Sequence, residues 1–242
     1  MRRGTLARGL NRIPSIATLL NRTLLLLALL VVTACGGDDD SRPAPAAPGT
    51  TVVAALGDSI TAGSPRWDPN PDIREQIGSQ LDRRSQYELW AQRALEGTDF
   101  RNCGVPGQLT DEIARRLEDC AEGADVLIIQ GGVNDLGTGR PPAAVAANLR
   151  GMVREGKRLG LRVALVELLP WNGSYPVADP LIRDVNRRIA RIARGEGVSV
   201  LPWYELLEDP QRPGRMRDVW TDDLLHPSVA GYRRLGESVE LP

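Results

Sequence analysis

The sequence of 242 residues contains one histidine, one phenylalanine and three cysteines, and only 4% of its residues are aromatic. A single histidine, His226, excludes a metal site built from several imidazoles. Three cysteines are too few for a small disulfide-rich protein. Basic and acidic residues nearly balance, 30 against 31, so the positive excess typical of nucleic-acid-binding proteins is missing as well. What remains is a globular protein, 42% hydrophobic and long enough for one sizeable domain.

Residues 1–34 have the pattern of an export signal. They contain five arginines and no acidic residue, and they end in the apolar run 23–34 (TLLLLALLVVTA). This run is too short to span a bilayer, which takes about 20 residues, so we expect a cleaved leader. The sequence VTAC at 32–35 resembles the lipobox of bacterial lipoproteins, which implies that Cys35 is lipidated and becomes the mature N-terminus. An ordinary secretory signal and an uncleaved anchor helix are the alternatives.

Cleavage of the leader changes the charge and the expected location of the protein. Without residues 1–34 the chain keeps 25 basic against 31 acidic residues, a formal net charge of −6. Residues 35–50 are first acidic and then rich in proline and alanine, which predicts a tether without a core. We therefore expect an exported monomer that is anchored to the outer face of a bacterial cell membrane by its lipid alone, or is secreted.

Residues 51–242 alternate between short apolar runs and segments of helical periodicity. The clearest helical segment has Ile182, Val185, Ile189 and Ile192 on one face and arginines on the other. Strict alternation of strand and helix predicts one α/β domain, with a parallel sheet covered on both faces. The five candidate strands are residues 52–56, 99–103, 126–129, 163–168 and 198–201.

Small and polar residues follow these strands, at the edge where parallel sheets bind ligands. Ser59, in Gly-Asp-Ser after the first strand, is a candidate nucleophile, although the G-x-S-x-G elbow is absent because Thr61 occupies the second glycine position. Gly104, at the end of the second strand, offers an unobstructed backbone N–H. Asn134, after the third strand, offers a carboxamide that can donate to an oxyanion. Each residue alone is equally compatible with a turn or a helix cap.

The lone histidine lies in the segment DDLLHP at 222–227. A carboxylate three residues before a histidine can accept its Nδ1–H and fix its tautomer, and this spacing selects Asp223 over Asp222. A surface-loop histidine is the alternative. A metal site is not expected, because too few ligands are present.

Four blocks together resemble the SGNH or GDSL hydrolases, a group of serine esterases and lipases. The blocks are GDSITAG at 57–63, NCGVPG at 102–107, GGVND at 131–135 and DLLHP at 223–227. The resemblance extends over about residues 51–237. It implies a three-layer α/β/α sandwich with a five-stranded parallel sheet of the flavodoxin-like type. Leu224 departs from the pattern, because many members have glycine there.

The resemblance also implies roles for individual residues. Ser59 would be the nucleophile, His226 the general base and Asp223 the carboxylate that orients it. The N–H groups of Ser59 and Gly104 and the side chain of Asn134 would form the oxyanion hole. The implied activity is hydrolysis of carboxylic esters through an acyl-enzyme, without a metal or organic cofactor.

The substrate is less well defined. The lack of a long apolar lid and the ten aromatic residues favour small or water-exposed acyl esters, including O-acetylated glycans, over triglycerides. Arg66, Trp67 and Arg74 in segment 64–87, together with Trp171, are candidates for the rim of the site; a solvated loop and a core contact are the alternatives. Transfer of an acyl group to a sugar hydroxyl, and ligand binding without turnover, are alternative functions.

The two cysteines of the domain, Cys103 and Cys120, are candidates for a disulfide in an oxidising compartment. Against this, Cys103 is predicted to end a strand and Cys120 to end the following helix, which would place them at opposite ends of the layer. A disulfide needs Cα atoms within about 7 Å. The sequence leaves both outcomes open.

Overall fold

The computed structural model describes residue 47 and residues 49–242. The predicted leader (1–34), Cys35 and most of the tether (35–50) lie outside these residues. The first strand begins at Thr51. Within the described part of the chain, no helix has the length and apolar character needed to cross a membrane.

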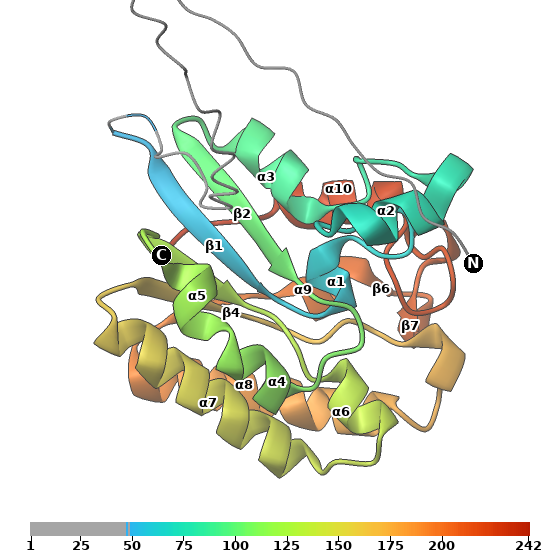
Figure 1. The fold of residues 1–242 in the computed structure, drawn as a ribbon. Coiled ribbons are helices and arrows are strands. Elements are labelled where there is room, and N and C mark those ends of the chain that lie inside the picture. The colour runs from blue at the N-terminus through green and yellow to red at the C-terminus, as the bar shows by residue number, and fades with distance from the viewer. Residues whose placement is uncertain (1–46, 48) are drawn as a thin grey trace, which may run out of the picture. The chain divides into compact units, whose positions relative to one another are not determined.

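A five-stranded sheet forms the centre of the domain, and all of its strand pairs are parallel. The strand order is β2-β1-β3-β4-β5, which is the flavodoxin-like order (Figure 1). The central strands are buried on both faces, as their continuous apolar runs predict. The strands are β1 (Thr51–Gly57), β2 (Thr98–Gly104), β3 (Val126–Ile129), β4 (Arg162–Val166) and β5 (Ser199–Leu201).

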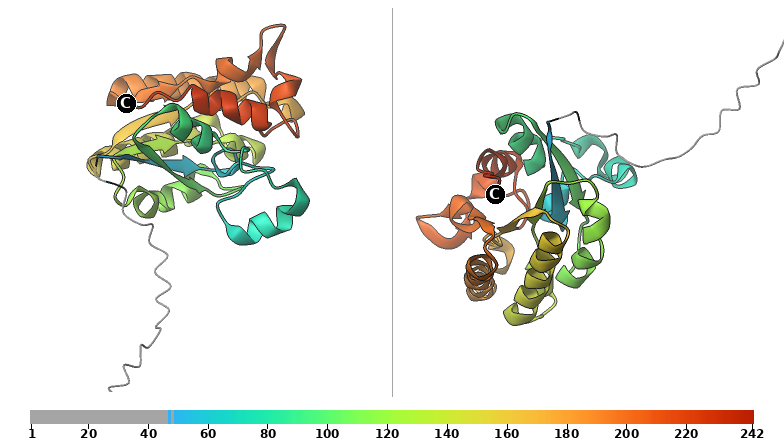
Figure 2. Two further views of the ribbon diagram at one scale, coloured as in Figure 1. Left: turned by 90° about the horizontal axis from the view of Figure 1, so that it is seen from above. Right: turned by 90° about the vertical axis from the view of Figure 1, so that its left-hand side faces the viewer.

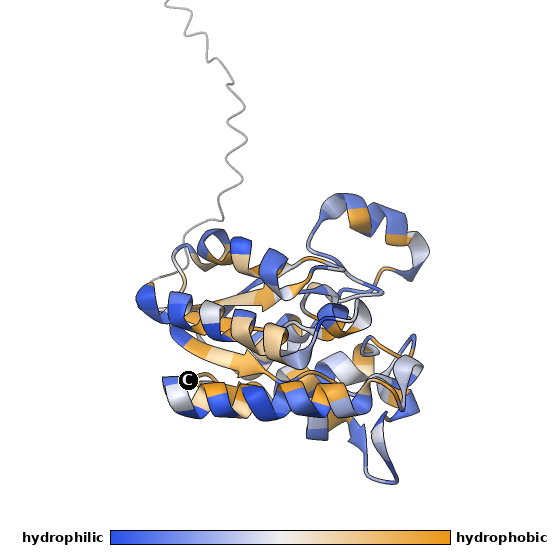
Figure 3. Cartoon of the chain, turned by 90° about the horizontal axis from the view of Figure 1, so that it is seen from below, coloured by the Kyte–Doolittle hydropathy of each residue, from blue (hydrophilic) through white to orange (hydrophobic). Residues whose placement is uncertain are grey.

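Helices cover both faces of the sheet and bury two apolar clusters against it. Figure 3 shows the hydrophobic residues on the strands and on the inward faces of the helices. On one face lie α4 (Thr110–Arg115), α5 (Leu117–Ala121), α7 (Pro142–Arg158) and α8 (Asp179–Glu196). On the other lie α3 (Tyr87–Ala94), α9 (Trp203–Leu207) and α10 (Val229–Glu237). The predicted three-layer sandwich is confirmed.

The periodicity of α8 shows why these segments are helical. Ile182, Val185, Ile189 and Ile192 recur every three or four residues and are all buried, while the arginines between them face solvent. Gly197, with a φ of 67°, ends the helix in the left-handed conformation that glycine adopts at low cost. The apolar periodicity therefore predicts the helix, and Gly197 marks its C-terminal end.

The ends of some elements differ from the prediction. The fourth strand ends at Val166, two residues early, because the chain turns there to place Leu168 against Asn186 of α8. The short antiparallel pair β6 (Glu208–Asp209) and β7 (Arg212–Met216) was not predicted. In segment 64–87 the structure forms α2 (Pro71–Ile77), followed by a 3₁₀ turn, η1 (Gly78–Gln80). Neither element buries a residue, and both extend away from the sheet (Figure 2).

Cys103 and Cys120 form a disulfide, with Cα atoms 6.0 Å apart. The expectation that packing would hold them at opposite ends of the layer is therefore wrong. The loop 105–109 carries the chain beyond the edge of the sheet, so that α4 begins beside Asp135, to which Thr110 donates two hydrogen bonds. The helical segment then returns past the end of β2, and Cys120 in α5 comes to lie beside Cys103.

Candidate active site

Ser59 is the first residue of α1 (Ser59–Ala62), a four-residue helix directly after β1. Asp58 caps this helix, because its Oδ1 accepts the N–H of Ile60 at 3.0 Å. Gly57 permits the sharp turn: a Cβ on it would lie 2.1 Å from Oγ1 of Thr61. The turn carries the serine hydroxyl beyond the carboxyl end of β1, which is the edge that the sequence pattern indicated.

Two buried or half-buried amide side chains hold α1 in place. The Oε1 atom of Gln130, after β3, accepts the N–H of Asp58 at 3.2 Å and the hydroxyl of Thr61 at 3.0 Å. The Nδ2 atom of Asn102, in β2, donates to the carbonyl of Thr61 at 2.8 Å. Thr61, which replaces the second glycine of the elbow motif, is thus fully buried and hydrogen-bonded. Sequence reasoning did not single out Gln130 or Asn102.

His226 and Asp223 lie on the loop before α10 and face Ser59. The Nε2 atom of His226 is 2.9 Å from Oγ of Ser59, and its Nδ1 is 2.6 Å from Oδ2 of Asp223. The other carboxylate oxygen of Asp223 accepts the N–H groups of His226 and Leu225 at 2.7 and 3.1 Å. Partial burial raises the pKa of Asp223, but the hydrogen bonds from His226 outweigh it and hold that pKa below its usual value. An ionised Asp223 therefore orients the ring so that Nε2 can accept the serine proton.

The aspartate next to Asp223 has a different partner. Asp222 pairs with Arg66, with Nε of Arg66 2.7 Å from its Oδ2. Leu224 has a φ of 72°, which makes it the one described residue other than glycine with a positive φ. Glycine adopts this conformation without a steric penalty. The positive φ therefore explains why glycine is favoured at this position in the SGNH pattern.

Asn134 lies in α6 (Val133–Gly137), directly after β3. Its Nδ2 donates to the carbonyl of Gln108 at 3.0 Å, so the loop after β2 lies beside it. The N–H of Gly104 was expected to point into the same site. Instead, it donates to Oδ1 of Asn102 at 2.9 Å, and a Cβ on Gly104 would lie only 2.0 Å from N of Ala62. Gly104 is therefore needed for the close approach of β2 to α1, and its N–H is already occupied.

The loop that follows offers another backbone donor. Val105, Pro106, Gly107 and Gln108 form a β-turn in which Gln108 N–H is 3.5 Å from the carbonyl of Val105. Proline in the second position and a glycine with a φ of 79° in the third are typical of a type II turn. The peptide between Pro106 and Gly107 is on the outside of such a turn, so the N–H of Gly107 is directed away from the turn's own hydrogen bond.

Two acidic side chains, Asp58 before α1 and Glu88 in α3, are buried. Burial raises the pKa of Asp58 to about 6, although the N–H of Ile60 opposes the shift. Glu88 of α3 is also buried, neither of its carboxyl oxygens has a hydrogen-bond partner in the described part of the chain, and burial raises its pKa well above the usual value. Burial thus shifts these two carboxyl groups toward their neutral forms, whereas the hydrogen bonds from His226 shift Asp223 toward its charged form.

The residues considered for the rim of the site have partners within the domain. Besides the pairing of Arg66 with Asp222, Arg74 lies over the ring of Trp67 at 5.0 Å and donates to the carbonyls of residues 68 and 69. Trp171 packs against both apolar clusters, and a Cβ on Gly137 would lie 3.4 Å from its ring. Trp171 thus lies between α6, which carries Asn134, and the core.

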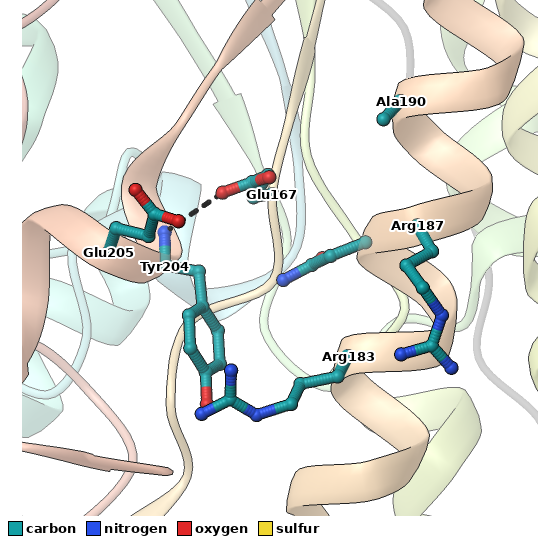
Figure 4. Close-up of a pocket in the computed structure, with 7 residues that line it drawn as sticks. Glu167, Arg183, Arg187, Ala190, Tyr204 and Glu205 are labelled. Atoms are coloured by element: carbon teal, nitrogen blue, oxygen red, sulfur yellow. Dashed lines mark hydrogen bonds between the residues drawn. The ribbon is translucent and has the colours of Figure 1, made fainter. Parts of the chain in front are cut away.

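A separate hollow of about 270 Å³ lies between α8 and α9 (Figure 4). Its lining includes Glu167, which accepts the N–H of Tyr204, and Arg183, which lies over the ring of Tyr204 at 4.7 Å. None of the predicted site residues lines it. Nowhere in residues 47 and 49–242 do three or more histidine, cysteine or acidic side chains gather as a metal site would require.

The chain is thus an α/β/α sandwich in which Ser59, His226 and Asp223 are hydrogen-bonded in series at the carboxyl edge of the sheet. The family model described as the GDSL-like lipase/acylhydrolase family matches residues 55–234. The chain belongs to this family. A search of the curated proteins finds no match.

Solved structures of the same family share the fold. A member of the lipolytic protein G-D-S-L family from Veillonella parvula aligns over 78% of this chain and 96% of its own, at 18% identity and a TM-score of 0.63. The lipase/acylhydrolase from Enterococcus faecalis aligns over 78% and 93%, at 24% identity and a TM-score of 0.60. A GDSL-like lipase from Bacteroides thetaiotaomicron aligns over 79% and 86%, at 20% identity and a TM-score of 0.58. At these identities the similarity concerns the fold alone.

The buried carboxyl of Asp58 predicts a pH dependence of stability. Between its unfolded pKa of 3.8 and its folded pKa of about 6, the folded state keeps a proton that the unfolded state releases, so this group lowers stability as pH rises. In D58N this contribution disappears. We expect the unfolding free energy of D58N, relative to the parent, to increase by about 2 to 3 kcal/mol from pH 4 to pH 7.

Urea unfolding at several pH values measures this difference. The matched control is D99N, which removes a carboxylate from an exposed position on β2. D99N should follow the parent across the pH range. Parallel pH profiles for D58N and the parent would contradict the prediction.

Proposed function

We propose that this protein hydrolyses carboxylic esters with Ser59 as its nucleophile. The observation that carries the proposal is the continuous chain of hydrogen bonds from Oγ of Ser59 through the His226 ring to Asp223, at 2.9 and 2.6 Å. A hydroxyl in contact with an imidazole that is itself oriented by a carboxylate can be activated for attack on a carbonyl carbon. Membership of an acylhydrolase family agrees with this chemistry.

The reaction follows from the positions of these groups. His226 Nε2 takes the proton of Ser59 as Oγ bonds to the ester carbonyl carbon, which gives a tetrahedral oxyanion. The same proton then passes from His226 to the leaving alcohol oxygen as the C–O bond breaks, and an acyl-enzyme remains. Water, deprotonated by His226, attacks the acyl carbon, and the acid leaves as the proton returns to Ser59. Asp223 stabilises the imidazolium in both halves of the cycle.

The oxyanion needs donors in fixed positions. The backbone N–H of Ser59 and Nδ2 of Asn134, which has a second hydrogen besides the one donated to Gln108, are two of them. For the third we propose the N–H of Gly107 in place of Gly104, because the Gly104 N–H already donates to Asn102. The turn that contains Gly107 lies beside Asn134 through the carbonyl of Gln108, which supports this assignment.

Substitution of the three side chains should reduce turnover by different amounts. We expect S59A and H226A to lower kcat for p-nitrophenyl acetate by about 10⁴- to 10⁶-fold, because nucleophile and base act as a unit. Loss of one oxyanion donor in N134A should cost about 10²- to 10³-fold. A fluorophosphonate should label the parent at Ser59, and S79A, at an exposed serine in η1, should react like the parent. Parental turnover by S59A would exclude this mechanism, and a protein that only binds its ligand would show neither turnover nor labelling.

For the substrate we propose small or water-exposed acyl esters, with O-acetylated glycans as one source. The openness of the site supports this: the side chain of Asp223 is 41% exposed, and Leu224 beside it is 54% exposed. An ester with a short acyl group can reach Ser59 from solvent without burying a long chain.

A series of p-nitrophenyl esters tests this proposal. We expect kcat/KM not to rise from the acetate to the twelve-carbon ester, because each added methylene remains in contact with water instead of gaining about 0.8 kcal/mol by burial. Acetylated xylan and peptidoglycan are the natural polymers to be assayed beside these esters. Rising kcat/KM with chain length would contradict the proposal, and an acylated alcohol or glycan formed from an added acceptor would identify an acyltransferase.

We further propose that the protein is exported and anchored by lipid on Cys35, with no other membrane contact. The leader pattern of residues 1–34 and the VTAC sequence support this. We expect the mature chain, produced in a bacterial host, to begin at Cys35 and to carry a diacylglycerol mass, and C35A to remain unprocessed and unlipidated. Intact-mass spectrometry measures both. Cleavage at another residue without added lipid mass would indicate a secreted protein instead.

A further inference from the structure

Arg116 joins several parts of the site that are far apart in the sequence. It lies between α4 and α5, is half-buried, and donates to three acceptors with three different nitrogen atoms. Nε is 2.8 Å from Oε1 of Gln108, Nη1 is 2.8 Å from the carbonyl of Cys103, and Nη2 is 3.1 Å from the carbonyl of Gly57. No carboxylate within residues 49–242 forms an ion pair with this guanidinium, which is unusual for an arginine with limited access to water.

Each acceptor is next to a group of the proposed reaction. The Gly57 carbonyl lies two residues before Ser59 and also accepts the N–H of Val105 at 3.1 Å. Cys103 precedes the turn 105–108. Gln108 ends that turn, and its own carbonyl accepts Nδ2 of Asn134. One guanidinium thus connects the end of β1, the end of β2 and the turn that lies beside Asn134.

We propose that Arg116 is a positioning residue that holds the turn 105–108, and through it the side chain of Asn134, at a fixed distance from Ser59. This proposal rests on the proposed esterase function. Arg116 does not reach the reacting atoms; it acts through the donors that surround them. A donor displaced by about 1 Å stabilises an oxyanion much less, so the effect should appear in kcat and not in KM.

The planar fork of arginine is suited to this task. Three acceptors in different directions are satisfied by one rigid group with five N–H donors. Lysine at the same position would bring a single ammonium group, which cannot span the same three acceptors. Loss of the side chain would leave the Gln108 amide and two carbonyls without this donor.

The test compares R116A and R116K with the matched control R115A. Arg115 is the preceding residue, and its side chain is 69% exposed and pairs only with Asp111. With p-nitrophenyl acetate we expect kcat to fall by about 10- to 100-fold in R116A, with KM within twofold of the parent. R116K should fall between R116A and the parent, and R115A should match the parent.

Chemical rescue separates positioning from a loss of stability. Added ethylguanidinium at millimolar concentration should raise kcat of R116A at least threefold and leave N134A unchanged, because it restores the donor and not the carboxamide. If R116A does not fold, kcat and KM of R116K are compared with those of the parent and R115A instead. A parental kcat in both variants, or an increase in KM alone, would overturn the proposal.

Hydrogen exchange gives a readout that does not depend on activity. We expect faster exchange of the backbone amides of residues 104, 105 and 107–109 in R116A, and no change in R115A. Unchanged exchange in R116A would overturn the role of Arg116 even if turnover falls. If the parent has no esterase activity and Ser59 is not labelled, the proposed function fails by itself, while exchange still decides whether Arg116 holds the turn.

Discussion

The close contact of α1 with the ends of β1 and β2 is the constraint on which the rest of the site depends. A Cβ on Gly57 or on Gly104 would fall within about 2 Å of this helix, so glycine at both positions lets the backbones approach. Because the helix is then buried, its polar groups need partners, and the side chains of Gln130 and Asn102 provide them. Ser59 is held by backbone and amide contacts, and its hydroxyl remains directed toward His226.

The same burial explains the two kinds of carboxyl group around the serine. Asp58 and Glu88 are buried, and desolvation raises their pKa values. Asp223 is partly exposed and hydrogen-bonded by His226, and its pKa is lowered. Solvent access and the bonded imidazole separate a structural acid from a carboxylate that can stabilise an imidazolium.

Much of the fold could be predicted because its signals are local. The alternation of apolar runs and helical periodicity is short-range information, and it located all five strands of the main sheet within about two residues. The spacing of Asp223 and His226 on one loop is equally local, so Asp223 could be preferred to Asp222 before its contact with the imidazole was known. The resemblance of four blocks to one family then placed Ser59, Asn134 and His226 at one edge of the sheet.

Contacts that depend on tertiary packing could not be predicted from these local signals. The sequence by itself determined the class of fold, the order of the elements and the residue types brought to the site, since each follows from periodicity, spacing or motif. Only the tertiary structure decided that the Gly104 N–H is taken by Asn102, that Cys103 and Cys120 meet, and that Arg116 joins the ends of β1 and β2 to the turn 105–108. These contacts depend on how far a loop carries the chain past the sheet edge, and that distance results from the packing of whole helices against the sheet.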